Sequence, residues 1–339
     1  MLFQLPGRRR QHKRPSEIIG VDLSSTGVKV VRVKKTKEGV TCLGAQILSA
    51  AALAGEEARE GRFPVPKDLL SNYAAIAVTG EEAVVRILSL QVPADGSAPD
   101  VTRVREQVGL GEEYRLGSIL TTPAKGKGEG KVLVAGLPEQ QAAATVQMFS
   151  VGAPAPFSLE LSGLAALDAF LVGPGAAQAQ GAVAVIESGA RITFMALFHR
   201  GVLSLVRKFD FGAEALIARV QHQLGVDRDT ALGAMSDSSF DLSQALREVM
   251  DPFLRQLSIS KDFVERREDC RVTTVYLSGG SSLLRHFGRE IATATGLEAQ
   301  TWNPFEGLRL EAGAYPAELD GQQTRFTAAI GAAWGVLAP

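Results

Sequence analysis

One local pattern occurs twice in the chain, and it limits what the chain can fold into. An apolar strand ends in an acidic residue, a turn of small residues follows, and two further strands complete a meander. The first copy runs from Ile18 to Leu48, and the second begins at Ala182 with "AVAVIESGARITFMALFHRGVLSLVRKFDFG". A chain of 339 residues is long enough for two or three packed units. We therefore interpret the second copy as an internal duplication of the first.

The first turn of each copy places one carboxylate where an anion could be bound. Asp22 opens the turn "DLSSTG", and Glu187 opens the turn "ESGARIT". Small residues let backbone N–H groups approach a bound anion. A polyphosphate also needs a counter-ion, usually Mg²⁺, which carboxylates hold through its water shell. Lys29, in the strand after the first turn, would add a point charge for the phosphates.

A third turn, "SGGSSL", follows the later apolar strand "VTTVYL". Gly279 and Gly280 would let a flat ring or a ribose lie on bare backbone at the N-terminus of a helix. Each turn is weak evidence when it is taken alone. Asp22 could instead be a turn carboxylate that accepts local N–H bonds, Glu187 could be a surface turn residue, and Lys29 could lie on a solvated face of its strand.

The segment between Asn72 and Gly152 predicts a compact α+β module with two strand pairs and two helices. The first strand pair is "AAIAVTG" and "AVVRILSL", which flank a turn at Gly80, and the second pair is "YRLGSILTT" and "KVLVAGLP". The helices are "PDVTRVREQV", with Asp100 as its N-cap, and "EQQAAATVQMFSVG". Before this module, "AALAGEEARE" is predicted to be helical until "FPVP" breaks it.

Helical spacing recurs in the second half of the chain. It predicts helices over residues 213–224 and from about 242 to 266. The helix after "SGG" is expected to begin with Ser281 or Ser282 as its cap. The final helix, "TRFTAAIGAAWGVL", has glycines four residues apart from Gly331 onward, which indicates close backbone packing.

Composition narrows the class of function. The formal net charge is −1, so the body of the chain has no overall signature of nucleic-acid binding. Cys42 and Cys270 lie far apart in the sequence, which favours a reducing compartment over a disulfide framework or a structural zinc. No apolar run approaches the roughly 20 residues that span a bilayer, so we expect a cytoplasmic protein. The basic residues near the start predict a solvated, disordered tail, with contact to an anionic membrane as the alternative.

The order of these elements resembles that of the actin and heat-shock ATPase superfamily. Within it, the chain is most similar to the PilM family, the actin-like cytoplasmic proteins of type IV pilus assembly machines. The resemblance is carried by "IIGVDLSSTGVKVVRV", by "VYLSGGSSLL" followed by "WNPFEGL", and by "FTAAIGAAWGVL". The stretch "KVLVAGLPEQQAAATVQMFSVGAPAPFSLELSGLAALDAF" is also similar to that family. The predicted module falls where PilM and the cell-division protein FtsA carry their extra subdomain.

The resemblance implies an α/β fold of the actin-like (ribonuclease H-like) class, with two lobes and an α+β insertion module in the first. We expect six segments: a basic disordered tail over 1–16, the opening segment of the first lobe over 17–71, the inserted module over 72–152, the remainder of the first lobe with a linker over 153–178, the second lobe over 179–309, and a C-terminal return to the first lobe over 310–339.

The resemblance also implies a site for ATP and Mg²⁺. Asp22 matches the acidic position of the first phosphate loop, and its spacing to Lys29 matches the lysine that returns to the phosphates. Asp22 and Glu187 would hold Mg²⁺, in both cases through water. No catalytic residue is assigned. The predicted nucleotide-binding residues are Asp22, Ser24, Ser25, Thr26, Gly27, Lys29, Glu187, Ser188, Gly189, Gly212, Gly279, Gly280 and Ser281.

Three positions depart from the family pattern. Ser24 stands where a glycine is common, Glu187 opens the second loop where aspartate is usual, and only Gly212 remains of a usual Gly-Gly pair. Glutamate is one methylene longer than aspartate, so it reaches an ion differently. These departures weaken the case for hydrolysis more than the case for the fold. We therefore expect a nucleotide-binding protein with weak or absent ATPase activity.

The resemblance implies a scaffold of a type IV pilus or a related envelope machine. Its partner would be the cytoplasmic N-terminal peptide of a PilN-like inner-membrane protein, docked between the first lobe and the module, and this partner would hold the chain at the inner membrane. Other pilus assembly proteins and self-association are further expectations. An FtsA-like division tether would need a C-terminal amphipathic helix, whereas "AAWGVLAP" is typical of a core. A small-molecule kinase would need a catalytic carboxylate, and none is assigned.

Overall fold

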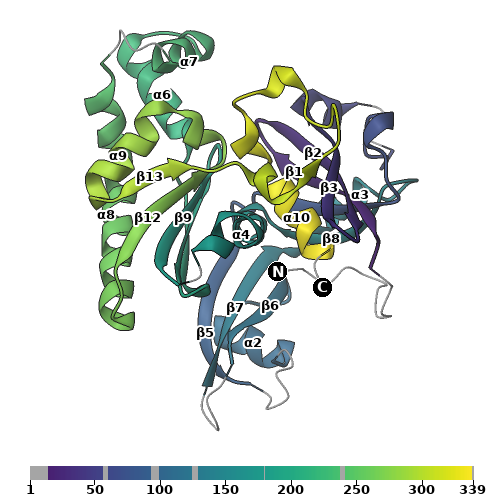
Figure 1. Cartoon of the computed structure of the whole chain (residues 1–339), viewed down its shortest axis with the longest axis horizontal. Helices are drawn as coiled ribbons and strands as arrows, with labels where there is room; N and C mark the ends of the chain where they lie inside the picture. Colours follow the sequence, from purple (N-terminus) through teal and green to yellow (C-terminus); the bar gives the residue numbers. More distant parts are fainter. Residues whose placement is uncertain are drawn as a thin grey trace. The chain divides into compact units, whose positions relative to one another are not determined.

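The computed structural model describes residues 14–55, 60–92, 99–123, 129–178, 180–236 and 241–337 (Figure 1). The chain forms two compact units. Unit 1 comprises the described residues of Met1–Gly173 and Pro304–Pro339, and unit 2 those of Pro174–Asn303. No helix in these ranges is both long enough and apolar enough to cross a membrane.

Unit 1 is built on a six-stranded sheet with the strand order β14-β3-β2-β1-β4-β8. The predicted meander is confirmed, because β1, β2 and β3 pair in antiparallel fashion along the chain. β4 then lies parallel to β1, and β8 lies parallel to β4. The strands are β1 (Glu17–Ser24), β2 (Gly27–Thr36), β3 (Gly39–Leu48), β4 (Tyr73–Val78), β8 (Ala155–Leu161) and β14 (Arg309–Leu310).

The predicted pairing of "AAIAVTG" with "AVVRILSL" is wrong. β4 contains the first of these stretches, and it belongs to the six-stranded sheet instead. Every residue of β4 after Tyr73 is buried. A strand that is buried on both faces is typical of a parallel sheet covered by helices, whereas an alternating strand suits a sheet with one solvated face.

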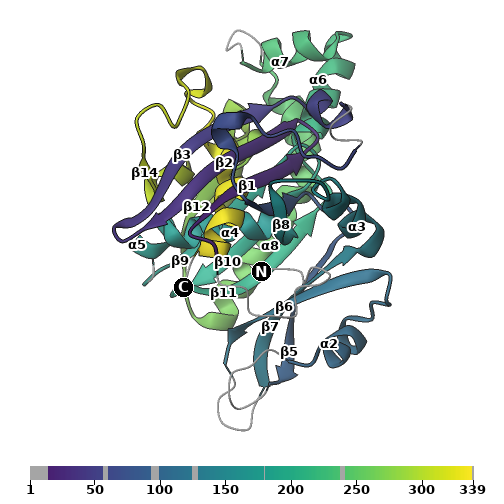
Figure 2. The same ribbon diagram turned by 90° about the vertical axis from the view of Figure 1, so that its right-hand side faces the viewer.

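The module itself is a three-stranded antiparallel sheet with the order β5-β7-β6 (Figure 2). Helix α2 packs on this sheet, and Val104 and Val108 join its small core. The predicted N-cap is confirmed, because the Asp100 side chain accepts a hydrogen bond from the backbone N–H of Thr102. The elements are β5 (Val84–Gln91), α2 (Val101–Val108), β6 (Tyr114–Thr122), β7 (Glu129–Pro138) and α3 (Glu139–Gln147).

Two helices rich in small residues, α4 (Ser162–Val172) and α10 (Thr327–Leu337), pack against each other and against the sheet of unit 1 (Figure 1). A Cβ atom on Gly331 would lie 1.7 Å from the carbonyl oxygen of Ala165. The glycine spacing in the last helix therefore reflects close backbone packing, as predicted.

Unit 2 contains a five-stranded sheet with the order β11-β10-β9-β12-β13. Its first three strands repeat the antiparallel meander, and β12 lies parallel to β9, which confirms the duplicated pattern. The strands are β9 (Ala182–Ser188), β10 (Thr193–His199), β11 (Val202–Phe209), β12 (Val272–Ser278) and β13 (Glu298–Thr301).

The helices of unit 2 are α5 (Pro174–Ala177), α6 (Ala213–Leu224), α7 (Arg228–Ser236), α8 (Ser243–Glu268) and α9 (Arg285–Thr295). The predicted helix over 213–224 is confirmed, and α8 extends the second predicted helix by two residues at its end. The serine cap of α9 is wrong, because Ser281 and Ser282 lie in a separate 3₁₀ turn and their hydroxyls donate to Gly189 and Gly279.

Short 3₁₀ turns complete the fold. The helix predicted for "AALAGEEARE" is only partly described, because η1 ends at Ala54 and residues 56–59 lie outside the described ranges. The turns are η1 (Ala50–Ala54), η2 (Lys67–Leu69), η3 (Gly280–Leu283), η4 (Pro304–Gly307), η5 (Ala317–Leu319) and η6 (Gln323–Phe326).

Candidate functional site

The first candidate loop connects β1 to β2 in unit 1. Ser24 and Gly27 face each other in the strand register, so only Ser25 and Thr26 form the tip of this hairpin. Gly27 has φ 111°, a conformation that side chains disfavour. A Cβ atom there would also lie 2.9 Å from the carbonyl oxygen of Leu48, so the loop needs glycine at this position.

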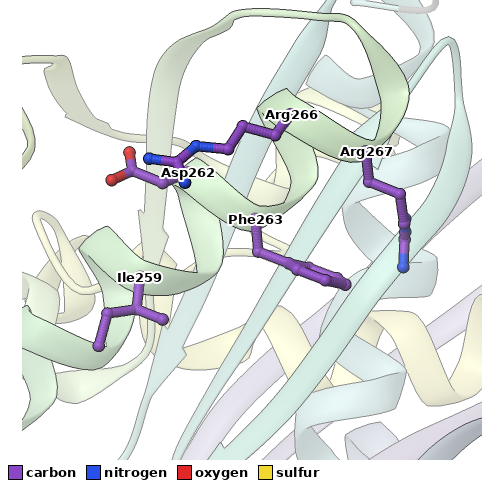
Figure 3. Close-up of a pocket in the computed structure, with 5 residues that line it drawn as sticks. All are labelled: Ile259, Asp262, Phe263, Arg266 and Arg267. Atoms are coloured by element: carbon purple, nitrogen blue, oxygen red, sulfur yellow. The ribbon is translucent and has the colours of Figure 1, made fainter.

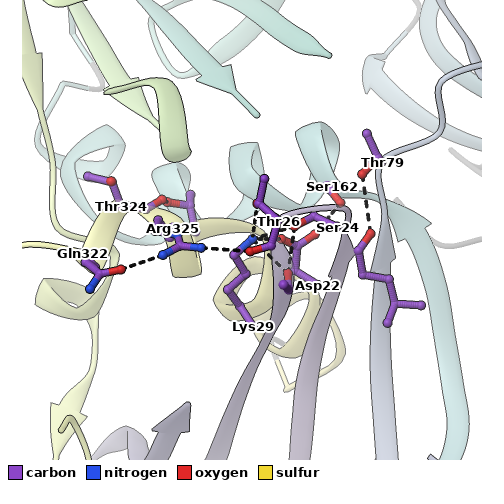
Figure 4. A network of polar contacts seen from close by, with 12 residues as sticks. Asp22, Ser24, Thr26, Lys29, Thr79, Ser162, Gln322, Thr324 and Arg325 are labelled. Atoms are coloured by element: carbon purple, nitrogen blue, oxygen red, sulfur yellow. Dashed lines mark hydrogen bonds and ion pairs between the residues drawn. The ribbon is translucent and has the colours of Figure 1, made fainter. Parts of the chain in front are cut away.

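Asp22 points into the interior of unit 1 at the base of this loop (Figure 4). Its Oδ1 accepts a hydrogen bond of 2.7 Å from the Ser162 hydroxyl at the start of α4. Its Oδ2 lies 4.0 Å from Lys29 Nζ. Burial raises the pKa of Asp22, whereas Lys29, the Ser162 hydrogen bond and Arg325 act in the opposite direction.

Lys29 reaches back from β2 to the loop, as the hairpin register requires. Its Nζ donates to Ser24 Oγ at 2.5 Å, to Thr26 Oγ1 at 3.3 Å and to the carbonyl oxygen of Gly27 at 3.1 Å. The side chain is 5% exposed. Lys29 is therefore not on a solvated strand face, and its charge is directed at the loop.

Arg325 is a second cation at this loop, and sequence reasoning missed it. Its Nη2 donates to the carbonyl oxygen of Thr26 at 3.2 Å, and its Nη1 donates to Gln322 Oε1 at 2.6 Å (Figure 4). Burial lowers the pKa of Arg325, and the charge of Asp22 opposes this shift. Two cations thus lie around one carboxylate, which makes the loop electropositive and suited to an anion. The only sequence signal was the arginine two residues before the last helix.

The second candidate loop follows β9 in unit 2, and it lies against the third turn. Glu187 and Ser278 are opposite each other in the parallel register of β9 and β12, and the Ser278 hydroxyl donates to Glu187 Oε2. A Cβ atom on Gly279 would lie 2.3 Å from the carbonyl oxygen of Ser188 and 2.8 Å from Glu187 Oε1. Gly279 therefore permits the close approach of the two turns.

Polar contacts hold the rest of this region together. The Ser281 hydroxyl donates to the carbonyl oxygen of Gly189 at 2.9 Å. Ser188 Oγ and Thr193 Oγ1 share a hydrogen bond of 2.8 Å across the base of the loop. A Cβ atom on Gly212 would lie 2.6 Å from the carbonyl oxygen of Gly189, so glycine is needed there as well.

Thus all seven predicted residues of unit 2 lie in one neighbourhood formed by the loop after β9, the start of α6 and the turn after β12. Gly280 begins η3 and has open space where a side chain would stand. The six predicted residues of unit 1 lie in the first hairpin. Each unit therefore contains its own cluster of loop residues.

Metal ligands are sparse in the described ranges. No group of three or more His, Cys, Asp or Glu side chains there could hold a metal ion. Asp22 supplies one carboxylate in unit 1, and Glu187 supplies one in unit 2. A single carboxylate suits Mg²⁺ that keeps most of its waters, and it does not suit an ion held by protein ligands alone.

A family model described as type IV pilus assembly protein PilM matches residues 165–335, slightly more than half of the chain. A solved structure described as a PilM-PilN type IV pilus biogenesis complex matches with a TM-score of 0.76 at 17% sequence identity, and the alignment covers 96% of this chain and 100% of that chain.

Two further solved structures resemble the chain more distantly. The ethanolamine utilization protein EutJ from Carboxydothermus hydrogenoformans gives a TM-score of 0.47 at 15% identity, covering 94% of this chain and 89% of its own. MreB 5 of Spiroplasma citri, solved with AMPPNP bound, gives a TM-score of 0.45 at 11% identity, covering 94% and 95%.

Proposed function

This chain belongs to the PilM family of type IV pilus assembly proteins and has the actin-like α/β fold, and from this premise we propose that it is a cytoplasmic scaffold that binds ATP with Mg²⁺ and a peptide of an inner-membrane protein. The observation that carries the nucleotide proposal is the pair of cations, Lys29 and Arg325, around the first loop.

The residues of both loops fit a polyphosphate. In unit 1, Lys29 and Arg325 would balance phosphate charge. The Thr26 hydroxyl, which accepts from Lys29, can donate to a phosphate oxygen, whereas the Ser24 hydroxyl already donates to the carbonyl oxygen of Gly27 at 2.9 Å. In unit 2, Gly279 and Gly280 provide bare backbone for a ribose or a base. When bound, Mg²⁺ supplies charge neutralisation at the phosphates. Asp22 is the carboxylate of the unit 1 loop that would orient it through water, and Glu187 is the corresponding carboxylate of the unit 2 loop.

Isothermal titration of the full chain with ATP tests this proposal. We expect heat and a thermal shift with Mg²⁺ present, and weaker binding when EDTA removes the metal. Absence of both signals at about 1 mM Mg-ATP, where even weak binding registers, would contradict the proposed nucleotide site and leave the family assignment unaffected.

We further propose that hydrolysis is slow or absent. Glu187 is longer than aspartate, and its carboxylate is already engaged by Ser278. Phosphoryl transfer depends on precisely held ions and donors, and a displacement of about 1 Å can cost about a hundredfold in rate. A steady-state turnover at or above about 1 per second that is lost in Asp22→Asn would refute slow hydrolysis.

The partner we propose is the cytoplasmic N-terminal peptide of a PilN-like inner-membrane protein, which would also hold the chain at the membrane. The name of the matched complex pairs PilM with PilN. In unit 1, β8 is an edge strand and can accept an added strand. Tyr73 and Phe157 form an aromatic pair there, with ring centroids 5.7 Å apart, and Tyr73 is 37% exposed.

Point substitutions test this docking better than a deletion of residues 72–152, because that deletion would remove β4, the strand that joins β8 to the rest of the sheet. We expect Tyr73→Arg to weaken the binding of the PilN-like N-terminal peptide at least about tenfold. Leu310→Arg is the matched control, because Leu310 is 52% exposed at the opposite edge of the same sheet. Equal losses in both variants, or no loss in Tyr73→Arg, would argue against docking at β8.

A further inference from the structure

The outward face of α8 in unit 2 carries a row of side chains that the proposed function does not use (Figure 3). Their spacing of three or four residues places them on one side of the helix. They border a hollow of about 510 Å³. We call this row the α8 stripe, and its members are Ile259, Asp262, Phe263, Arg266 and Arg267.

The centre of the α8 stripe is apolar and exposed. Ile259 is 55% exposed and Phe263 is 49% exposed, and the two residues are one helical turn apart. The helix does not lack a buried face, because Leu257 and Val264 on its other side lie in the core of unit 2. Adjacent large apolar side chains with a polar rim are typical of a protein-interaction surface.

Neighbouring groups hold Phe263 in place. The Arg267 guanidinium lies over the Phe263 ring, 4.9 Å from its centroid. Arg267 itself donates to the carbonyl oxygen of Ser204 at 2.8 Å and to Glu268 Oε1 at 2.6 Å. A preorganised aromatic side chain loses little conformational freedom when a partner covers it.

Cations stand at both ends of the apolar centre. Arg255 lies one turn before Ile259, and Arg266 lies near the other end, and both are exposed. Neither arginine makes an ion pair with any residue in the described ranges. Asp262, the carboxylate of the stripe, pairs with Lys261 at 3.1 Å. The stripe therefore presents an apolar middle with a cation at each end, which complements a segment with apolar residues flanked by carboxylates.

We propose that the α8 stripe docks an acidic amphipathic helix of a partner protein. Packing of helix against helix uses apolar side chains three and four residues apart, which is the spacing that Ile259 and Phe263 present. The carboxylates of the partner would pair with Arg255 and Arg266. This surface lies wholly in unit 2, and it shares no residue with the two candidate loops or with β8.

Two other occupants fit less well. A second copy of the chain, paired antiparallel about the midpoint between Ile259 and Phe263, would bring Arg255 opposite Arg267, and like charges there are unfavourable. An anionic membrane would also face Asp262 and Asp269, which are exposed at the same end of α8. A protein partner can place its charges between these groups, whereas a lipid surface cannot.

Site-specific photo-crosslinking of the full chain in its native cells tests the proposal. A photoreactive phenylalanine analogue replaces Ile259 in one variant and Leu310 in the control, and mass spectrometry identifies the crosslinked peptide. We expect position 259 to capture a segment with apolar residues at helical spacing flanked by Asp or Glu. A synthetic copy of that segment should bind the purified chain and lose at least about tenfold in affinity with Phe263→Glu.

A charge swap gives the sharper result. Arg266→Glu should weaken the binding of the synthetic segment. A second synthetic segment, in which lysine replaces the acidic residues, should bind the Arg266→Glu variant and should not bind the unmodified chain. Ile259→Glu serves if Phe263→Glu does not fold. Crosslinking to a second copy, flotation with phosphatidylglycerol vesicles that depends on Phe263, a captured segment without acidic residues, or no capture above the Leu310 control would each overturn the proposal.

Discussion

Asp22 and Lys29 occupy directly opposite positions in the hairpin of β1 and β2, and 4.0 Å separates Asp22 Oδ2 from Lys29 Nζ. Both side chains are almost completely buried. Their other partners are unequal. Lys29 has three further oxygen acceptors in its own loop, whereas Asp22 has the Ser162 hydroxyl. Removing the charge of Lys29 should therefore change the free energy of unfolding by a different amount than removing the charge of Asp22.

We expect Lys29→Met to lower the free energy of unfolding by about 3 kcal/mol at neutral pH, because it leaves a buried carboxylate without its nearest cation. Asp22→Asn should cost less, since Lys29 keeps its loop acceptors. The double variant should be less damaged than the sum of the two, with a coupling of about 1–3 kcal/mol by urea denaturation. Additive losses would show that the two charges do not interact.

Arg325 is expected to contribute to nucleotide affinity. Arg325→Gln should weaken the binding of Mg-ATP about tenfold or more, because one charge-assisted hydrogen bond contributes about 1.5–3 kcal/mol. Arg309→Gln is the matched control, since Arg309 lies in the same unit but forms a surface ion pair with Glu38. Isothermal titration measures the affinity of both variants for Mg-ATP. Equal affinities in Arg325→Gln and Arg309→Gln would exclude Arg325 from the nucleotide site.

Gly331 should tolerate no side chain. Gly331→Ala places a methyl group 1.7 Å from the carbonyl oxygen of Ala165, so α10 and α4 must separate, and we expect a loss of at least about 3 kcal/mol. Gly233→Ala in α7 is the control, because no atom lies within 4 Å of its Cβ position. That change should raise stability by about 0.5–1 kcal/mol through helix propensity. The midpoint temperature of thermal unfolding should therefore fall in Gly331→Ala and rise in Gly233→Ala.

Glu160 should make stability depend on pH. Burial, with a smaller contribution from the Asp168 carboxylate, raises the pKa of Glu160 to about 8. The folded chain then holds a proton that the unfolded chain releases near pH 4.5, so stability falls as the pH rises from about 4.5 to about 8, by up to about 1.4 kcal/mol per pH unit.

Glu160→Gln should remove the part of that slope that comes from Glu160, because an amide does not titrate in this range. Asp22 and Asp168, whose pKa values burial also raises, keep their own contributions. Urea unfolding at pH 5, 6.5 and 8 measures the difference between the variant and the unmodified chain. Glu311→Gln, at an exposed position of the same unit, should leave the slope unchanged. If the free energy of unfolding of Glu160→Gln changed with pH as steeply as that of the unmodified chain, the slope would come from groups other than Glu160.

Local patterns predicted local structure well. The 213–224 helix and the β-meanders follow from periodicity and turn residues, which act between neighbours in the sequence. The pairing of β4 did not follow, because an apolar run of "AAIAV" fits a parallel strand as well as a hairpin. Arg325 was missed for a related reason, since its contact with Thr26 exists only after the last helix has packed beside β1.

The position of the module between β4 and β8 has a consequence for how the chain can be shortened. β4 and β8 are parallel neighbours, so the chain must return along the whole length of the sheet before β8 can begin. A parallel connection needs about a dozen residues or more. The segment from Gly80 to Pro154 therefore provides this return path in addition to its own sheet. A minimal version of this fold that lacks the module would still need a replacement bridge, and joining Val78 to Ala155 by a tight turn would reverse the direction of β8.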